Sequence, residues 1–405
     1  MHRRPLVPPV PRPAVSDLRA AARLAARTVV GVTDVVEAAH ATVVRPVGRP
    51  RRTRGVTGMV YRMVRAVTRG VARLLDRGLA AAERTPFVQS EVEQAPGPIR
   101  DAVVAALNGA FGDTLVAEGS PWATPTHLRR DGRPLDLTEA GRLADPADVL
   151  LVQVHGICMH DAQWGTATHD PGAELAEALG ATRLALRYNS GRHVSENGAD
   201  LARLLDDAVT AWPVPVRRVV IVGHSMGGLV ARSAIETARA EGHEWLRLGV
   251  SLVTLGTPHH GAPLERIGNA VDALLGATRW GAPYARIGQS RSLGVTDLRW
   301  GSVHADDWAG LERFERGPDP RRHVPIPEGV TAYVVAATTG DGAGGLRDQT
   351  WGDGLVPLDS ALGRHPDPAR TLAVPPERRR TFTGTTHFDL LSRPEVTDQL
   401  IDWLA

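Results

Sequence analysis

The clearest chemical signal in the sequence is a serine held between glycines at the end of a hydrophobic run. Ser225 lies in the segment Gly-His-Ser-Met-Gly, residues 223–227, after the β-branched run 219–222 and before the helix-like stretch 226–240. Glycines two residues to either side permit the tight turn that holds a side-chain oxygen clear of the backbone. The same turn points the amide of Met226 towards a site where negative charge can develop. This strand–turn–helix setting predicts a nucleophilic serine.

A serine hydroxyl becomes a strong nucleophile only when a base removes its proton and a carboxylate orients that base. The segment around Ser225 resembles the nucleophile elbow of the α/β-hydrolase superfamily, and more narrowly of its bacterial lipases and esterases. The resemblance extends over most of residues 149–393. It includes His155-Gly156 after the first strong strand, Gly-Thr-Pro-His-His-Gly at 256–261 and Gly-Asp-Gly-Leu-Val at 352–356.

The resemblance implies partners for the serine, because the superfamily's chain order is Ser, acid, His. His387, in Thr-Thr-His-Phe-Asp near the C-terminus, resembles the His-x-Asp segment of bacterial lipases and is the expected base. Asp353 resembles the acid of the lipases' Asp-Gly-Leu-Val loop and precedes His387 by 34 residues. Asp341, directly after a predicted strand, is the alternative acid. The backbone N–H groups of Ile157 and Met226 are the expected oxyanion donors.

We expect no metal and no cofactor. No pair of histidines has the spacing of a zinc-binding helix or a zinc ribbon. Some bacterial lipases bind structural calcium through an aspartate two residues after the catalytic histidine. Asp389 fits that place, but the sequence identifies no partner carboxylate.

The elements that would position these residues follow a recurring pattern after residue 148. Short apolar runs alternate with helical stretches, at 149–154, 182–188, 217–223, 249–256 and 329–337. Continuous β-branched runs separated by helices are typical of parallel strands buried on both faces. We therefore predict an α/β fold over 146–405: an α/β-hydrolase domain with a doubly wound, mostly parallel sheet and a helical cap insertion, preceded by an N-terminal helical segment.

Nearly 70 residues separate Gly261 from the strand at 329, too many for a simple connection. An insertion over about 262–328 resembles a cap above the serine. Its aromatic residues either line an acyl site or form the core of the cap itself. The candidate pocket residues, from this insertion and from neighbouring strand ends, are Met159, Trp164, Tyr188, Trp280 and Tyr284.

The N-terminal part differs from the rest in charge and periodicity. Residues 1–15 contain five prolines and are expected to be a disordered tail, whereas 98–145 predict a helix at 99–111 and a hairpin at 131–132. Between them, 16–97 predict two basic amphipathic helices. In the second, apolar residues including Val64, Val71 and Leu74 take one side, and the other carries Arg62, Arg65, Arg69, Arg73 and Arg77.

Composition limits what this basic segment does. There are 17 arginines against five acidic residues in 1–90, and the chain has no lysine. The two helices can pack within the protein or make peripheral contact with an anionic membrane through 16–85. We expect no nucleic-acid binding, because no aromatic residues alternate with the arginines as stacking platforms.

Other classes of protein are excluded by simple counts. The 42% hydrophobic and 23% charged composition is that of a globular protein, and one cysteine cannot form an internal disulfide. No apolar run approaches the roughly 20 residues of a membrane span. The proline-broken N-terminus lacks the apolar core of a secretory signal. We expect a cytoplasmic protein, with a membrane-peripheral one as the alternative.

The sequence therefore predicts a serine-dependent hydrolase of carboxylic esters, an esterase or lipase that forms an acyl-serine intermediate on a small-molecule or lipid substrate. Thioesterase, amidase or acyltransferase activity at the same three residues remains open. A non-catalytic scaffold that docks membranes through its basic helices is the alternative from another class. The acyl chain, the alcohol and the oligomeric state stay undetermined by sequence.

Overall fold

The chain divides into two compact units. One comprises Met1–Val103 and Ala270–Gly288, and the other comprises Val104–Asn269 and Gln289–Ala405. The computed structural model describes residues 98–262, 291–312, 319–341 and 351–405, with short gaps at 118, 121, 139–142 and 167, and scattered helical residues between 29 and 78. The predicted tail and domain boundaries stay predictions.

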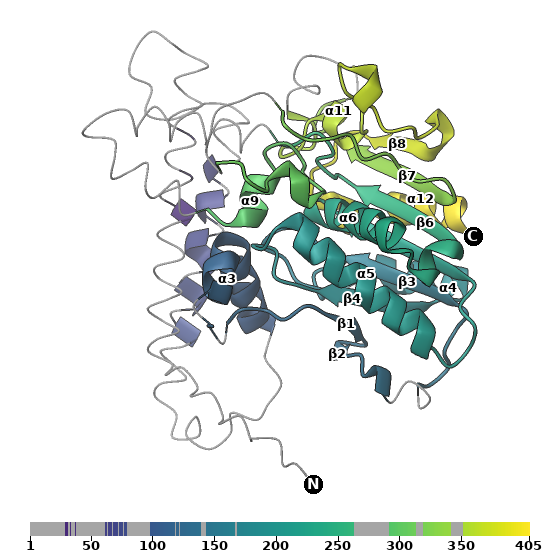
Figure 1. The fold of residues 1–405 in the computed structure, drawn as a ribbon. Coiled ribbons are helices and arrows are strands. Elements are labelled where there is room, and N and C mark those ends of the chain that lie inside the picture. The colour runs from purple at the N-terminus through teal and green to yellow at the C-terminus, as the bar shows by residue number, and fades with distance from the viewer. Residues whose placement is uncertain are drawn as a thin grey trace, which may run out of the picture. The chain divides into compact units, whose positions relative to one another are not determined.

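An eight-stranded, mostly parallel sheet forms the centre of the larger unit (Figure 1). Its order is β2-β1-β4-β3-β5-β6-β7-β8. β1 is antiparallel to both of its neighbours, and the remaining pairs are parallel. The strands are β1 (His127–Arg130), β2 (Arg133–Pro134), β3 (Val149–Val154), β4 (Thr182–Arg187), β5 (Arg218–His224), β6 (Gly249–Leu255), β7 (Val330–Ala337) and β8 (Arg379–Phe382).

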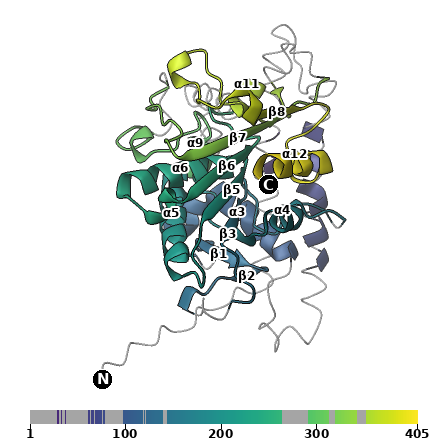
Figure 2. The same ribbon diagram turned by 90° about the vertical axis from the view of Figure 1, so that its right-hand side faces the viewer.

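Helices cover both faces of this sheet (Figure 2). α5 (Val194–Ala211) and α6 (Met226–Glu241) lie on one face, and α4 (Pro171–Leu179) and α12 (Pro394–Leu404) on the other. All six residues of β3 are buried, and alternate ones join different cores: Leu150 and Val152 face α5 and α6, and Leu151 faces α4 and α12. Burial on both faces explains why this strand is apolar without alternation.

The predicted fold class is confirmed. All five predicted strands are present with ends within one residue of those expected. The predicted hairpin is the β1–β2 connection, where Asp131 and Gly132 both have positive φ values, of 50° and 72°. The predicted helix at 99–111 is longer, α3 (Pro98–Ala117), with non-helical backbone at Phe111. β8 was not predicted, because its short Arg-Arg-Thr-Phe sequence has no apolar run.

The remaining described elements are short. They are α9 (Leu293–Asp297), α11 (Leu358–Ala361) and the 3₁₀ turns η3 (Glu244–Arg247), η4 (Ala305–Asp307), η5 (Pro368–Arg370), η6 (Pro376–Arg378) and η7 (Asp389–Leu391). α9 and η4 belong to the insertion predicted as a cap, and a buried contact joins α9 to α5. Asp297 accepts hydrogen bonds from the ring of His193 at 3.0 Å and from the Val194 N–H at 2.8 Å. Residues 263–290 lie outside the described part.

In the N-terminal unit, a buried ion pair joins two helical stretches. Arg65 bonds to Glu37, and both side chains are almost fully buried. Arg65, predicted on the same side as the other arginines of this helix, is therefore buried, whereas Arg62, Arg69, Arg73 and Arg77 are exposed. Val64, Val71 and Leu74, predicted to share the apolar side of this helix, are exposed. Arg65 is buried because the buried carboxylate of Glu37 needs a cation beside it in the same low-dielectric space. None of the described helices is long and apolar enough to span a membrane.

The N-terminus of α4 provides a test of local stability. The Asp170 carboxylate accepts hydrogen bonds from the N–H groups of Gly172 and Ala173 and pairs with Arg183 at 2.7 Å. We expect Asp170→Ala to lower the free energy of unfolding, measured in urea, by about 1 kcal/mol. Asp170→Asn keeps the cap and loses only the charge. It is the control and should lower the free energy of unfolding by only a few tenths of that amount. Equal losses would show that the ion pair, not the cap, stabilises this end.

Candidate active site

Ser225 occupies a sharp corner between β5 and α6. Its backbone has φ 53° and ψ −124°, in a region that residues with a Cβ rarely adopt. Such a conformation costs about 1–3 kcal/mol and persists only where surrounding contacts fix it. Here the Ser225 N–H donates to the Leu255 carbonyl at 2.8 Å, and the Ser225 carbonyl accepts from the Gly228 N–H at 3.1 Å.

The glycines of the corner are required by close packing. A Cβ on Gly223 would lie 2.6 Å from the Gly228 Cα, and one on Gly227 would overlap the Val154 carbonyl oxygen. Real Cβ atoms do not approach backbone atoms this closely, so no larger residue fits without moving α6. The sequence interpretation of these glycines thus has a direct steric basis.

His387 and Asp353 form a buried pair. The His387 Nδ1–H donates to Asp353 Oδ2 at 2.7 Å, and the His387 backbone N–H donates to the Asp353 carbonyl at 3.1 Å. The other carboxylate oxygen accepts from the N–H groups of Leu355 and Val356, at 3.0 and 2.8 Å. Asp353 is therefore both a turn residue and the partner of His387. With the proton on Nδ1, the Nε2 lone pair of the ring is available to act as a base.

His224 connects the His387–Asp353 pair to the segment that carries Ser225. Its ring centroid lies 4.7 Å from that of His387, and its Nε2–H donates to the His387 carbonyl at 3.1 Å. His224 precedes Ser225 directly, so this contact holds the two segments together. Among the described residues no hydrogen bond joins the Ser225 hydroxyl to His387. Bonds between nucleophile and base are often long in unliganded enzymes and tighten when substrate binds.

The loop after β3 lies against the serine. A Cβ on Gly156 would lie 3.1 Å from the Cβ of Ser225, so the backbone of His155-Gly156-Ile157 borders the corner. Tyr188 supports this loop from behind: its hydroxyl donates to the His155 carbonyl at 2.7 Å, and its ring stacks on that of His155 at 4.2 Å. Met226, whose amide is the other expected oxyanion donor, is the first residue of α6.

The structure brings some predicted pocket residues near Ser225 and gives others a different environment. The Met159 sulfur lies beside Gly156, and Trp164 contacts the ring of His224 edge-on, with centroids 6.5 Å apart. Tyr188 is buried and its hydroxyl is occupied by the loop carbonyl, which suits support better than lining a pocket. Trp280 and Tyr284 lie outside the described residues. Asp341, the alternative acid, is exposed, and no bond to His387 is found within the described chain.

Sequence reasoning missed the roles of His224 and Tyr188. His224 was part of the serine motif, but nothing in its spacing indicated a contact with a residue 163 positions later. Tyr188 was chosen because it follows a strand at the correct edge, which is the only signal the sequence carries for it. Both roles depend on which strand ends are neighbours, and that follows from the sheet order.

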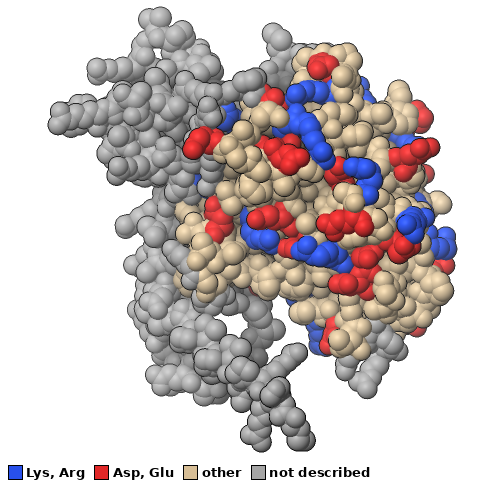
Figure 3. All heavy atoms as spheres, viewed as in Figure 1, with Lys and Arg blue, Asp and Glu red and all other residues tan. Residues whose placement is uncertain are grey.

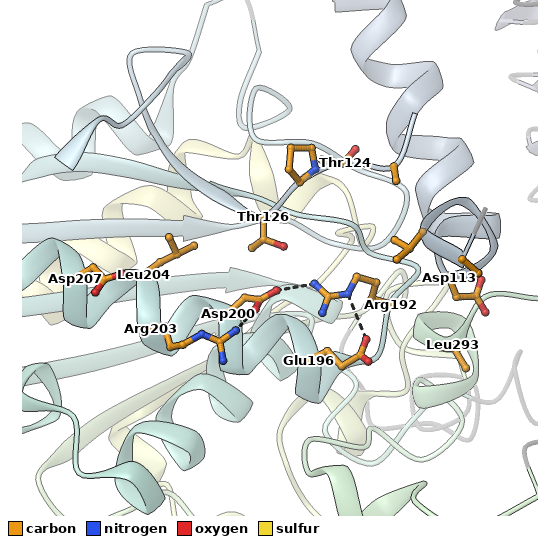
Figure 4. A pocket seen from close by; sticks show the side chains of 14 residues that line it. Asp113, Thr124, Thr126, Arg192, Glu196, Asp200, Arg203, Leu204, Asp207 and Leu293 are labelled. Carbon is orange, nitrogen blue, oxygen red and sulfur yellow. Dashed lines mark hydrogen bonds and ion pairs between the residues drawn. The ribbon is translucent and has the colours of Figure 1, made fainter. Parts of the chain in front are cut away.

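A cavity of about 690 Å³ lies beside α5 (Figure 4). One wall is formed by charged side chains of α5 and of the residues just before it. Arg192 there pairs with Glu196 and Asp200. The other wall includes Thr124, Thr126 and small apolar residues. None of the predicted site residues lines this cavity, so it is distinct from the serine corner.

Burial keeps several histidines of the larger unit in their neutral form. Burial lowers the pKa of His155 to about 4. Burial and the nearby ring of His387 hold the pKa of His224 well below its usual value, and burial and Arg232 do the same for His259.

These pKa shifts predict that the protein loses stability in mild acid. Between pH 6.5 and about 4, His155 binds a proton only in the unfolded chain, so its contribution is present above pH 6.5 and is lost as pH falls. From His155 alone the free energy of unfolding should drop by about 2 kcal/mol between pH 7 and pH 5. His155→Phe, which retains an aromatic ring against Tyr188, should show a shallower dependence in urea titrations. If His155→Phe left the pH dependence of the free energy of unfolding unchanged, His155 would not be the cause of the stability loss in acid.

A family model and several solved structures align with parts of the chain. A family model described as a PGAP1-like α/β domain matches residues 199–315. The mature lipase BlEst2 of Bacillus licheniformis aligns with 21% identity and a TM-score of 0.41, covering 69% of this chain and 97% of that one. An esterase of Pyrobaculum calidifontis aligns with 14% identity and a TM-score of 0.37, covering 79% and 96%. No curated protein matches the chain.

The family match agrees with the resemblance predicted from the sequence over residues 199–315. The elbow segment and α6 fall inside the matched range, and the sheet on which they lie is mostly parallel with helices on both faces. Over residues 199–315 the chain resembles the PGAP1-like α/β domain.

Proposed function

We propose that the protein hydrolyses carboxylic esters, with Ser225 as the nucleophile. The observation that carries the proposal is the arrangement of His387: its ring is bonded to the buried Asp353 on one side and lies against His224, the neighbour of Ser225, on the other. A base that is oriented by a carboxylate and lies next to a serine is the arrangement that activates the serine hydroxyl.

In the proposed reaction His387 Nε2 takes the proton of the Ser225 hydroxyl as its oxygen attacks the ester carbonyl. The tetrahedral intermediate collapses, the alcohol leaves with the proton from His387, and an acyl-serine remains. Water, deprotonated by the same ring, attacks the acyl group and releases the carboxylic acid and free serine. Asp353 keeps the ring in the tautomer that accepts the proton and stabilises the imidazolium that forms.

The oxyanion is stabilised by backbone amides in this proposal. The Met226 N–H stands at the N-terminus of α6, where the helix macrodipole favours negative charge. The Ile157 N–H comes from the loop that borders Ser225 and is braced by Tyr188. Losing one such donor typically lowers turnover by roughly 10²–10³-fold.

Removing the serine oxygen is the direct test. Ser225→Ala should lower hydrolysis of p-nitrophenyl esters by at least roughly 10⁴-fold, because no other described group replaces the nucleophile. A fluorophosphonate probe should label the wild-type protein and leave the variant unlabelled. Ser392→Ala, at a position without a side-chain hydrogen bond in the described structure, is the control and should retain both activity and labelling. Full ester turnover by Ser225→Ala would refute the proposal.

The substrate class is measured on the same protein. We expect matched ester substrates to be cleaved faster than amides, and a series of p-nitrophenyl esters to define the preferred acyl length. Faster turnover of the matched thioester would instead favour the thioesterase alternative. A preference for long chains that increases with liposomes would indicate a lipase, and short chains alone an esterase.

His224 is proposed as a positioning residue for His387. His224→Phe keeps the ring contact but removes the donor to the His387 carbonyl, and kcat should fall about tenfold with KM unchanged. His224→Gln, whose amide can donate, should restore most of kcat. If His224→Gln is as impaired as His224→Phe while both fold normally, the hydrogen bond does not position the base.

A further inference from the structure

The N-terminal unit carries an exposed apolar stripe beside exposed arginines. Val64, Val71 and Leu74 are 39%, 45% and 67% exposed. They are seven and ten residues apart, about two and three helical turns, so they share one side of the helical stretch 61–78. Exposed large aliphatic side chains in a row are unusual for a surface that faces only water.

The same stretch presents a row of positive charge. Arg62, Arg69, Arg73 and Arg77 are exposed and lie seven, four and four residues apart, which places them on a second side of the helix. Within the described residues none of these four makes an ion pair. Arg65 differs because it is buried against Glu37. This buried pair, with the buried Tyr61, defines the packed side, and the described apolar residues and arginines of the other two sides are exposed.

From this arrangement we propose that the stretch 61–78 lies on the surface of an anionic lipid bilayer, with Val64, Val71 and Leu74 inserted at the headgroup boundary. An amphipathic helix with aliphatic residues on one side and arginines on another binds an interface through both apolar burial and charge. Arginine stems also extend along apolar surface while their charged ends reach the phosphates. This membrane binding does not require hydrolysis at Ser225.

The surface of the larger unit gives a useful contrast. On the face that carries α5 and α6, acidic and basic side chains are interspersed (Figure 3). Arginines there are paired, as in Arg247 with Glu244 at 2.6 Å and Arg322 with Glu236 at 2.8 Å. Paired charges offer little net attraction to an anionic membrane, so these arginines provide matched controls for those of the helix.

The test is flotation of the full chain with vesicles of phosphatidylcholine alone or mixed with phosphatidylglycerol. Wild-type protein should bind the mixed vesicles, release at high salt and bind the neutral ones weakly. Arg69→Gln/Arg73→Gln/Arg77→Gln should weaken binding roughly 100-fold, from the loss of three charges near the surface. Val71→Ser/Leu74→Ser should weaken it roughly tenfold, from lost apolar burial. Arg247→Gln/Arg322→Gln should bind as wild type.

Ser225→Ala separates this proposal from the enzymatic one, because a variant without the nucleophile should bind vesicles as wild type does. Circular dichroism and thermal unfolding establish that each variant remains folded. No binding to anionic vesicles by folded wild-type protein would overturn the proposal. Binding that persists in both helix variants, or that does not depend on anionic lipid, would also overturn it.

Discussion

The left-handed backbone of Ser225 is the constraint on which the site depends. A residue with a Cβ adopts φ 53° only where its neighbours leave no relaxed alternative. Its N–H is fixed to Leu255 of the adjacent strand, and its carbonyl to Gly228 in the first turn of α6. Relaxing the angle would break these bonds or drive α6 into β3, because Gly227 already touches the Val154 carbonyl. The strain is therefore maintained by the packing of α6 against the sheet.

Parallel strands then determine which segments can meet the serine. β3 and β5 are neighbours whose carboxyl ends lie at one edge, so the His155-Gly156 loop arrives beside Ser225 without a long connection. Asp353 and His387 are held to each other by a backbone bond as well as a side-chain bond, and so act as one unit. A Cβ on Gly256 would lie 3.1 Å from both Asp353 Oδ2 and His387 Nδ1, which closes the loop after β6 against that pair. The order of the strands therefore brings together residues that no single sequence motif contains.

Local signals in the sequence were sufficient for the strands and the serine corner. A run such as 149–154 is apolar throughout because both faces of β3 are covered, and that pattern is visible without coordinates. β8 was not predicted, because a four-residue edge strand with two consecutive arginines and no apolar run resembles a loop. His224 and Tyr188 escaped prediction because their roles come from contacts 163 and 33 residues away. For 61–78 the sequence left open whether the apolar side is covered, since periodicity locates an apolar side without saying whether anything packs on it.

Whether a charged side chain of this protein acts on its surroundings depends on its pairing and burial more than on the overall composition. The net charge of +2 averages over a basic N-terminal part and an acidic remainder. In the larger unit, Arg187 is held to Asp161 in a nearly buried pair, and the histidines that border Ser225 are kept neutral by burial. Arginine stays ionised at every pH a cell reaches, so an exposed and unpaired arginine retains its full field at the surface. Arg65 and Arg69 lie one helical turn apart, yet only the second can act on something outside the chain, because Glu37 neutralises the first. The same residue type therefore stabilises the fold at one position and carries an external charge at the next, and burial alone separates the two roles.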